Sequence, residues 1–171
     1  MRSQIRTVLI ALAAMAAGAL ASSVVLSLPP TATQAQPIAA AAAAQPTGPR
    51  HHGMVIHIDQ NDPAVMKMAL GNAENLLNYY EDKGEAVDIE FVANGPGLHM
   101  LRSDTSPVKD RIAAMSQKRK TVSFRGCGNT IKGQSRDEEK AVMLIPEASI
   151  VPAGVARILE RQEQGWAYFR P

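Results

Sequence analysis

Polar and apolar positions after residue 53 alternate between two patterns. Short runs of apolar residues predict strands at residues 54–59, 87–93, 121–124, 149–151 and 166–169. Most of these runs carry few polar side chains, as expected for strands that are covered on both faces. In the second run, however, Asp88 and Glu90 alternate with apolar residues. We therefore expect that strand to begin half exposed and to lie near a sheet edge.

Amphipathic stretches separate the predicted strands. Asp62 and Pro63 predict a helix start, apolar residues then recur every three or four positions, and Gly84 predicts the end. Ser135 and Glu138 have the spacing of a capping box, which predicts a helix from residue 135 to about residue 144. Other helical pieces are predicted at residues 98–102, after Ser106-Pro107 and after Pro152.

Alternation of strands and helices defines the expected fold class. It predicts βαβ units with right-handed crossovers. The fold is therefore α/β, a three-layer α/β/α sandwich with a mainly parallel sheet of about five strands. Residues 53–171 have the length of one domain, with no internal repeat.

The start of the chain has the pattern of an export signal. Two arginines precede an uncharged apolar stretch, and small residues offer cleavage after Ala21 or after Ala35. We prefer Ala35, which makes residues 1–35 a signal peptide, because Pro29-Pro30 ends the apolar helix. The alternative is an uncleaved membrane anchor, since a span needs about 20 residues. Both alternatives place the remainder outside the cytoplasm, as a periplasmic or secreted protein.

Residues 36–52 form the expected linker. Alanine, proline, glutamine and glycine dominate, and no apolar face recurs, so we predict a disordered tether. The pair His51-His52 closes it. Weak metal binding by this pair is one reading, and a solvated tail is the favoured one. The folded domain is expected over residues 53–171.

The net charge of the chain says little about its binding partners. The chain has 18 Lys and Arg against 16 Asp and Glu, and the two signs are interspersed. The densest basic run, residues 118–120, falls at a predicted helix end, where it complements the helix dipole. We therefore expect no nucleic-acid partner, and membrane attachment only if the N-terminal segment stays uncleaved.

Candidate chemistry lies where the predicted strands end. In open parallel sheets, ligands bind beyond the carboxyl ends of the strands. There the single cysteine, Cys127, is flanked by Gly126 and Gly128. A helical turn starting just past Cys127, with Arg125 nearby, would favour the thiolate and suit nucleophilic sulfur chemistry. The alternative is that Cys127 is a small buried apolar residue.

Other candidates surround this cysteine in the predicted fold. The candidate ligand-binding residues are Asn94, Gly95, Gly97, Gly126, Gly128, Asn129 and His57. With Cys127, His57 and His99 could form a base–nucleophile group or a metal site if the loops converge. No close His/Cys spacing supports this, so we expect a hydrogen-bonded structural His57, a surface His99, no metal and no cofactor.

Several segments resemble the DsrE superfamily. Residues 122–130, VSFRGCGNT, are similar to its strand-to-cysteine segment. Residues 150–157 and 162–168 resemble the C-terminal signature of its stand-alone members. His57-Ile58-Asp59 and Asn94-Gly95-Pro96-Gly97 fit its first two strand ends. The resemblance extends over residues 53–171.

This resemblance implies a function as well as a fold. It implies a parallel α/β sandwich, a homo-oligomer and sulfur relay, with Cys127 accepting sulfane sulfur as a persulfide from a donor and passing it to an acceptor protein. This branch has no established reaction, so whether the chain is an enzyme stays open. The alternative is a non-catalytic small-ligand-binding or oligomeric module, with Trp166, Tyr168 and Phe169 at an interface and Cys127 as packing.

Overall fold

A computed structural model describes residues 51–171 of the chain. The elements in order are β1 (His51–Ile58), α1 (Pro63–Glu81), β2 (Ala86–Ala93), the 3₁₀ helix η1 (Gly95–Leu101), α2 (Lys109–Lys118), β3 (Val122–Cys127), α3 (Gly128–Asp137), β4 (Ala148–Val151), α4 (Gly154–Glu163) and β5 (Ala167–Phe169). The predicted signal or anchor at residues 1–35 and the linker up to residue 50 lie outside the described residues. Within residues 51–171, no helix is long and apolar enough to cross a membrane.

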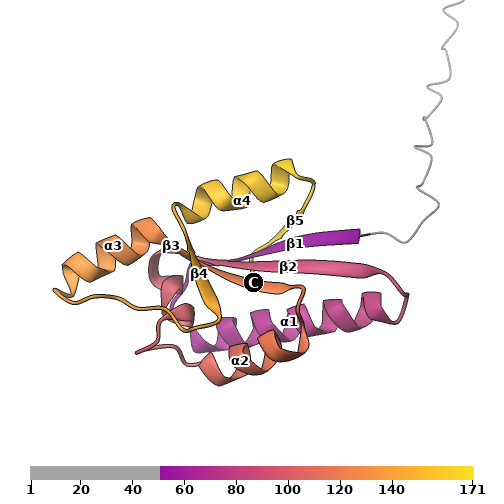
Figure 1. The fold of residues 1–171 in the computed structure, drawn as a ribbon, viewed down its shortest axis with the longest axis horizontal. Coiled ribbons are helices and arrows are strands. Elements are labelled where there is room, and N and C mark those ends of the chain that lie inside the picture. The colour runs from indigo at the N-terminus through magenta and orange to yellow at the C-terminus, as the bar shows by residue number, and fades with distance from the viewer. Residues whose placement is uncertain (1–50) are drawn as a thin grey trace, which may run out of the picture. The chain divides into compact units, whose positions relative to one another are not determined.

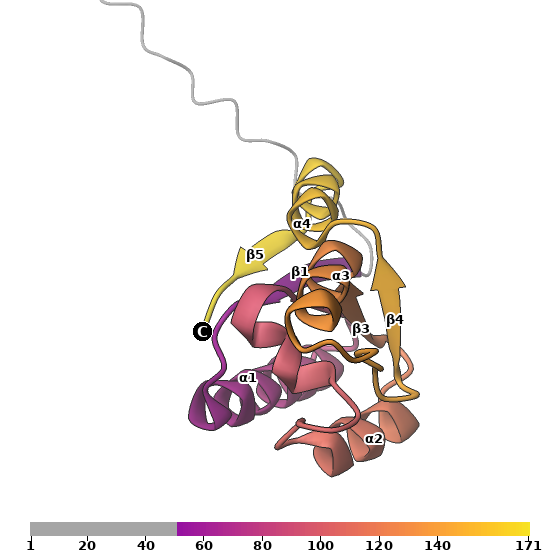
Figure 2. The same ribbon diagram turned by 90° about the vertical axis from the view of Figure 1, so that its left-hand side faces the viewer.

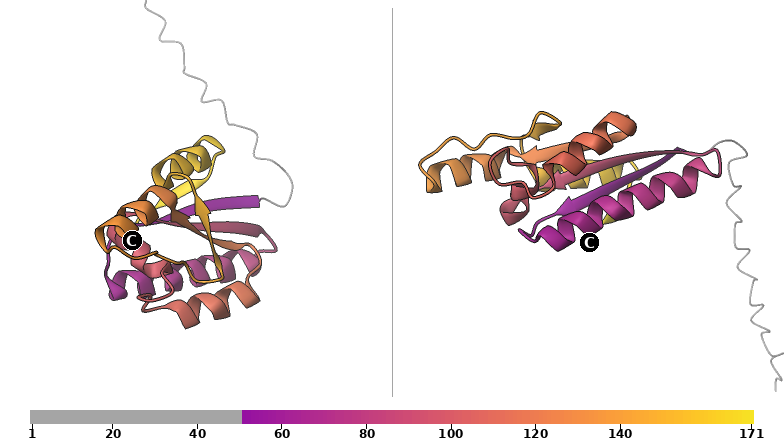
Figure 3. Two further views of the ribbon diagram at one scale, coloured as in Figure 1. Left: turned by 60° about the vertical axis from the view of Figure 1, so that its left-hand side comes forward. Right: turned by 90° about the horizontal axis from the view of Figure 1, so that it is seen from below.

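The five strands form one parallel sheet in the order β4-β3-β2-β1-β5. Helices α1 and α2 cover one face, and α3 and α4 lie on the other side (Figures 1 and 3). The three-layer α/β fold class is therefore confirmed. The last strand, β5, pairs with the first, so that Tyr168 lies beside Val55 and Phe169 beside Ile56.

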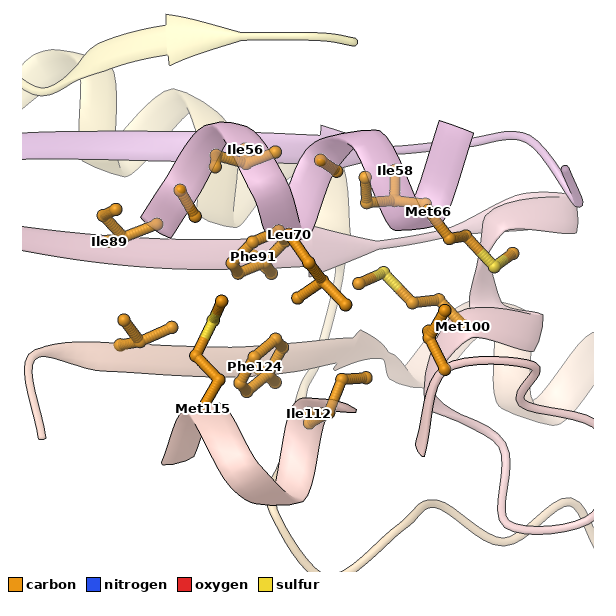
Figure 4. Close-up of a cluster of buried hydrophobic side chains, with 14 of the residues drawn as sticks. Ile56, Ile58, Met66, Leu70, Ile89, Phe91, Met100, Ile112, Met115 and Phe124 are labelled. Carbon is orange, nitrogen blue, oxygen red and sulfur yellow. The ribbon is translucent and has the colours of Figure 1, made fainter. Parts of the chain in front are cut away.

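The two faces of the sheet are packed very differently. Between the sheet and α1 and α2, Phe91 and Phe124 stack with ring centroids 4.9 Å apart, and Leu70 and Ile112 pack around them (Figure 4). Against α4, the buried apolar cluster contains only Val55, Val92 and Ile158. Apolar burial is the main driving force of packing. Contacts other than apolar ones must therefore help to hold α4 on the sheet.

Helix α1 begins and ends as its sequence predicts. The Asp62 carboxylate accepts a hydrogen bond from the Ala64 N–H at 2.7 Å, and Pro63 occupies the first helical position. Gly84 follows the helix with φ +68°, a backbone conformation that glycine adopts without steric cost.

The expected edge position of β2 is wrong, because β2 is the central strand of the sheet. The strand does begin partly exposed, because Asp88 is 37% exposed and lies 2.7 Å from the exposed His51 ring. Glu90, in contrast, is fully buried among arginine side chains. The charge of Glu90 therefore reflects internal ion pairing rather than exposure.

The helix predicted from residue 135 is also wrong. Helix α3 occupies Gly128–Asp137, directly after β3. The Ser135 hydroxyl accepts a hydrogen bond from the Val142 N–H at 3.0 Å, and Glu138 pairs with Arg102. Both residues that matched a capping box thus close the loop after α3 rather than starting a helix.

The folded part begins slightly earlier than expected, because His51 and His52 belong to β1 instead of closing the linker. The His51 ring contacts the Asp88 carboxylate, and the His52 ring lies 2.7 Å from the Glu85 carboxylate. His52 also stacks on Tyr80 with ring centroids 4.0 Å apart. Both histidines are therefore part of strand β1 and not of a solvated tail.

Candidate functional site

Cys127 is the last residue of β3 and the residue that precedes α3. Its backbone is extended, with φ −70° and ψ 116°, and Gly128 starts the helix immediately. The placement of Cys127 at the carboxyl edge of the sheet is confirmed, and a helix does start just past it, which is the condition under which a thiolate was expected to be favoured. Figure 2 is viewed toward this edge, with α3 and the short helix before α2 in front.

The thiol of Cys127 is nearly buried and well supplied with hydrogen bonds. Its residue is 6% exposed, and Sγ accepts a hydrogen bond from the Gly154 N–H at 3.2 Å. Burial by itself would raise the pKa of the thiol. Hydrogen bonds from the Thr130 hydroxyl and from the backbone of Gly154, Thr130 and Asn129 outweigh burial, and the pKa lies below its ordinary value. This environment favours the thiolate.

Thr130 connects the thiol to the loop after β2. Its hydroxyl oxygen accepts a hydrogen bond from the Gly95 N–H at 3.0 Å, while the hydroxyl bonds to the thiol. The Gln134 side chain donates to the Gly95 carbonyl oxygen at 3.1 Å. Thr130 was not singled out from the sequence, although its position three residues after Cys127, on the first turn of a helix, was a usable signal.

Two predicted residues, His57 and Asn94, do come together. The His57 ring lies 3.1 Å from Asn94 Oδ1 through Nε2 and 2.9 Å from the Tyr168 hydroxyl through Nδ1. His57 is thus hydrogen-bonded, as expected for a structural role. A β-carbon added to Gly154 would lie 3.2 Å from the Cβ atoms of both Asn94 and Cys127, so these two residues flank the start of α4.

His99 does not join this group. Its Nδ1 lies 2.8 Å from the hydroxyl of Thr105, a residue of the loop after η1. Within the described part of the chain, no group of three or more His, Cys, Asp or Glu residues is placed to hold a metal ion.

Three of the candidate glycines make room for protein rather than for a ligand. A β-carbon at Gly126 would lie 2.7 Å from the Leu144 side chain, and one at Gly97 would overlap the Ile58 carbonyl group. At Gly128 it would meet the Val151 carbonyl oxygen at 3.2 Å. At these positions the missing side chain allows close packing of neighbouring segments. Gly95 differs, because its φ of +49° lies in the left-handed region, which glycine adopts without steric cost.

A shallow depression of about 460 Å³ opens at this edge. Its lining includes Gly95, His99, Thr130 and Gln134. Cys127 does not line it, but Thr130 bonds directly to the thiol. Asn129, another predicted residue, is exposed to solvent. A second depression, of about 420 Å³ and lined by residues 84–87 and 118–121, contains none of the predicted residues.

The most strongly charged interior group was not predicted. We call Glu90, Arg125, Arg157 and Arg161 the Glu90 cluster. Glu90 accepts hydrogen bonds from Arg157 at 2.6 and 3.0 Å, from Arg161 at 2.7 Å and from Arg125 at 3.4 Å. Its side chain is 0% exposed. Two of the arginines come from α4, so the cluster fastens that helix to the centre of the sheet.

Electrostatics within the Glu90 cluster favour the charged carboxylate. Burial would raise the pKa of Glu90, but hydrogen bonds from Arg157 and Arg161 and their positive charges lower it to about 2. Arg161 also lies over the Trp166 ring, with 4.1 Å between the guanidinium carbon and the ring centroid.

The C-terminal aromatic residues mostly complete the domain itself. Trp166 packs against Gly53, where an added β-carbon would lie 2.5 Å from its ring. Phe169 packs against the main core. Tyr168 is 43% exposed and is bonded to His57.

Fold and site together define a class: a parallel α/β protein with a hydrogen-bonded thiol at the carboxyl edge of its sheet. Neither protein-family models nor curated proteins give a match to the chain. Among solved structures, it is similar to MTH1491 from Methanobacterium thermoautotrophicum, described as a protein of unknown function. The two are 32% identical with a TM-score of 0.59, over 70% of this chain and 99% of that one. The chain belongs to the same family as MTH1491.

Proposed function

We propose that the chain is an exported, DsrE-like sulfur-handling protein that carries sulfane sulfur as a persulfide on Cys127. The observation that carries this proposal is the environment of the thiol. Three backbone N–H groups and the Thr130 hydroxyl bond to Sγ, and the pKa of Cys127 is lowered despite burial. A thiolate is the nucleophilic form of cysteine. The resemblance of residues 122–130 to the DsrE superfamily supplies the type of chemistry.

The proposed step is a displacement at sulfur. With thiosulfate as donor, the Cys127 thiolate attacks the outer sulfur and forms the new S–S bond. The S–S bond of thiosulfate breaks, and sulfite leaves with its electron pair. Cys127 is then a persulfide anion, and charge and oxidation level balance without a further reactant. The depression that Thr130 lines is the candidate place for the donor to bind, and Cys127 lies behind Thr130 rather than in the lining.

Exposure of the purified protein to thiosulfate or polysulfide is expected to add about 32 Da, one sulfur atom, to the intact mass. The adduct should disappear on reduction and should be absent from Cys127→Ser, which keeps the size of the side chain. Circular dichroism of both proteins checks that the fold is unchanged. A native thiol that stays unmodified, while the urea-unfolded chain reacts, would contradict the proposal.

Export is the second part of the proposal. Its support is the basic start, the uncharged apolar stretch and the small residues before residue 36. We expect the mature protein to be recovered outside the cytoplasm with Gln36 as its first residue. N-terminal sequencing of the fractionated protein measures this. A full-length chain in the membrane fraction would favour the uncleaved anchor, and a full-length chain in the cytoplasm would contradict export.

A non-catalytic, oligomeric module is the second candidate function. The low exposure of Cys127 favours it, because a thiol sealed by Gly154 also fits a packing role. Val155 and Leu159 are 68% and 57% exposed on α4, one turn apart, and offer an apolar face for another copy. The mass experiment separates the two candidates, because only the first requires the folded protein to react at Cys127.

A further inference from the structure

The Glu90 cluster contains more positive charge than its own carboxylates neutralise. Three arginines surround Glu90, and the other carboxylate in contact with them is Glu160, which lies 3.3 Å from Arg157. Three guanidinium groups against two carboxylates leave one positive charge. A surplus cation close to a protein interior is costly unless an anion or water compensates it.

Hydrogen-bond donors are also in surplus. Each guanidinium group carries several N–H donors in a rigid fork, whereas a carboxylate has two oxygen atoms. Glu90 already receives bonds from all three arginines. Among residues 51–171, Arg161 Nε is buried and has no hydrogen-bond partner. The cluster is thus built with unused donor capacity.

Arg125 is the member best placed to bind a further anion. It holds Glu90 through one contact at 3.4 Å, the longest in the cluster, while Arg157 and Arg161 approach to 2.6 and 2.7 Å. Its side chain is 30% exposed, more than that of either other arginine. Its Nη1 also contacts the hydroxyl of Ser149, an exposed residue of β4.

The positions of Arg125 and Ser149 on the sheet leave both side chains accessible to solvent. Arg125 and Ser149 are paired neighbours on β3 and β4, on the face that carries α4. Arg157 contacts the same carboxylate, Glu90, from α4, and its side chain is 23% exposed. A guanidinium fork with a hydroxyl beside it matches the geometry of a tetrahedral oxyanion.

We propose that Arg125, Ser149 and Arg157 form a binding site for a small tetrahedral oxyanion of the sulfate or phosphate class. The anion balances the surplus charge of the Glu90 cluster and uses the Nη2 donors of Arg125, since Nε contacts Glu90 and Nη1 contacts Ser149. This site lies on the same face of β3 as Cys127, two residues earlier along the strand. Binding there does not require Cys127 to react, so the inference stands apart from the persulfide proposal.

Isothermal titration of the purified chain with inorganic sulfate and with inorganic phosphate, at constant ionic strength, tests the site. We expect saturable binding of one anion per chain. Arg125→Gln should weaken binding about tenfold or more, because it removes the fork but leaves Glu90 bound to Arg157 and Arg161. Arg136→Gln is the matched control, since this arginine of α3 is 82% exposed and contacts only its neighbour Asp137.

The outcomes are distinct. Loss of affinity in Arg125→Gln with little change in Arg136→Gln supports the site. Equal weakening in both variants, or heats that do not saturate, overturns it, because only the overall charge would then matter. A phosphate monoester is the third titrant. Tighter binding than free phosphate indicates that the site takes the anionic group of a larger molecule, and equal or weaker binding indicates the free ion.

Discussion

Replacing Glu90 with glutamine is expected to lower the free energy of unfolding by about 3–5 kcal/mol, because it leaves partly buried arginines without their carboxylate. Glu90 is 0% exposed and receives hydrogen bonds from three guanidinium groups. Glutamine keeps the size of the side chain but not its charge. The small apolar cluster at α4 otherwise consists of Ile158 of the helix against Val55 and Val92 of the sheet, so little compensates for the loss. Urea unfolding followed by circular dichroism measures the change.

Glu74→Gln is the matched control, since Glu74 pairs with Arg119 but is 37% exposed and should contribute about 0–1 kcal/mol. Acid provides a second readout. The pKa of Glu90 falls from an ordinary value of 4.5 to about 2 in the folded protein. Its contribution is therefore complete above pH 4.5 and is lost as the pH falls toward 2. Glu90→Gln should lack this part of the acid dependence. A stability close to that of Glu74→Gln would contradict the expected role.

Arg102→Met is expected to destabilise the protein by about 2–3 kcal/mol, the second largest effect. Arg102 is 1% exposed and is the largest fully buried side chain of the described residues. It donates to Asp104 at 2.9 and 3.0 Å, to Gln134 at 3.1 Å and to Glu138 at 2.7 Å. Methionine keeps much of the volume but makes none of these bonds, so the loop after α3 should loosen. Thermal and urea unfolding report the change.

Arg119→Met serves as the comparison. Arg119 also binds several acceptors, among them Glu74 and Glu81, but its side chain is 22% exposed. Because its partners Glu74 and Glu81 are 37% and 67% exposed and can bind water instead, we expect a loss of about 0–1 kcal/mol. Similar losses in the two variants would show that the burial of Arg102 is not the cause. The partners of Arg102 remain about one-third exposed and can bind water, which keeps the expected loss below that for Glu90.

Sequence patterns predicted those features of the fold that depend on interactions between residues close together in the sequence. The start of α1 at Asp62-Pro63 follows from capping and proline geometry, whereas the helix after Cys127 was expected from residue 135 and begins at Gly128 instead. The strand order does not depend on local interactions. Glu90 looked like a solvent-facing residue, because the arginines that neutralise it lie 35, 67 and 71 positions away. No window of the sequence contains that information.

The sequence also predicted only part of the candidate site. Cys127, Asn94 and His57 were expected at the carboxyl edge, and the structure places them there. The contact that seals the thiol was not expected, because Gly154 reaches Cys127 only when α4 packs back over the sheet. Gly126 and Gly97 were expected to contact a ligand. The sequence alone does not show whether the space left by a missing side chain is occupied by a ligand or by a neighbouring segment of the protein, and here neighbouring segments occupy it.

The pairing of β5 with β1 affects the order in which the chain can fold during synthesis. One edge of β1 is covered by only three residue pairs, and these come from β5, which is synthesised after the other four strands of the sheet. Until then, β1 presents unpaired backbone groups along that edge, which is the side of a sheet most prone to pair with another chain. The growing chain therefore cannot close its sheet early. It remains dependent on whatever keeps that edge apart from other strands until β5 has been synthesised.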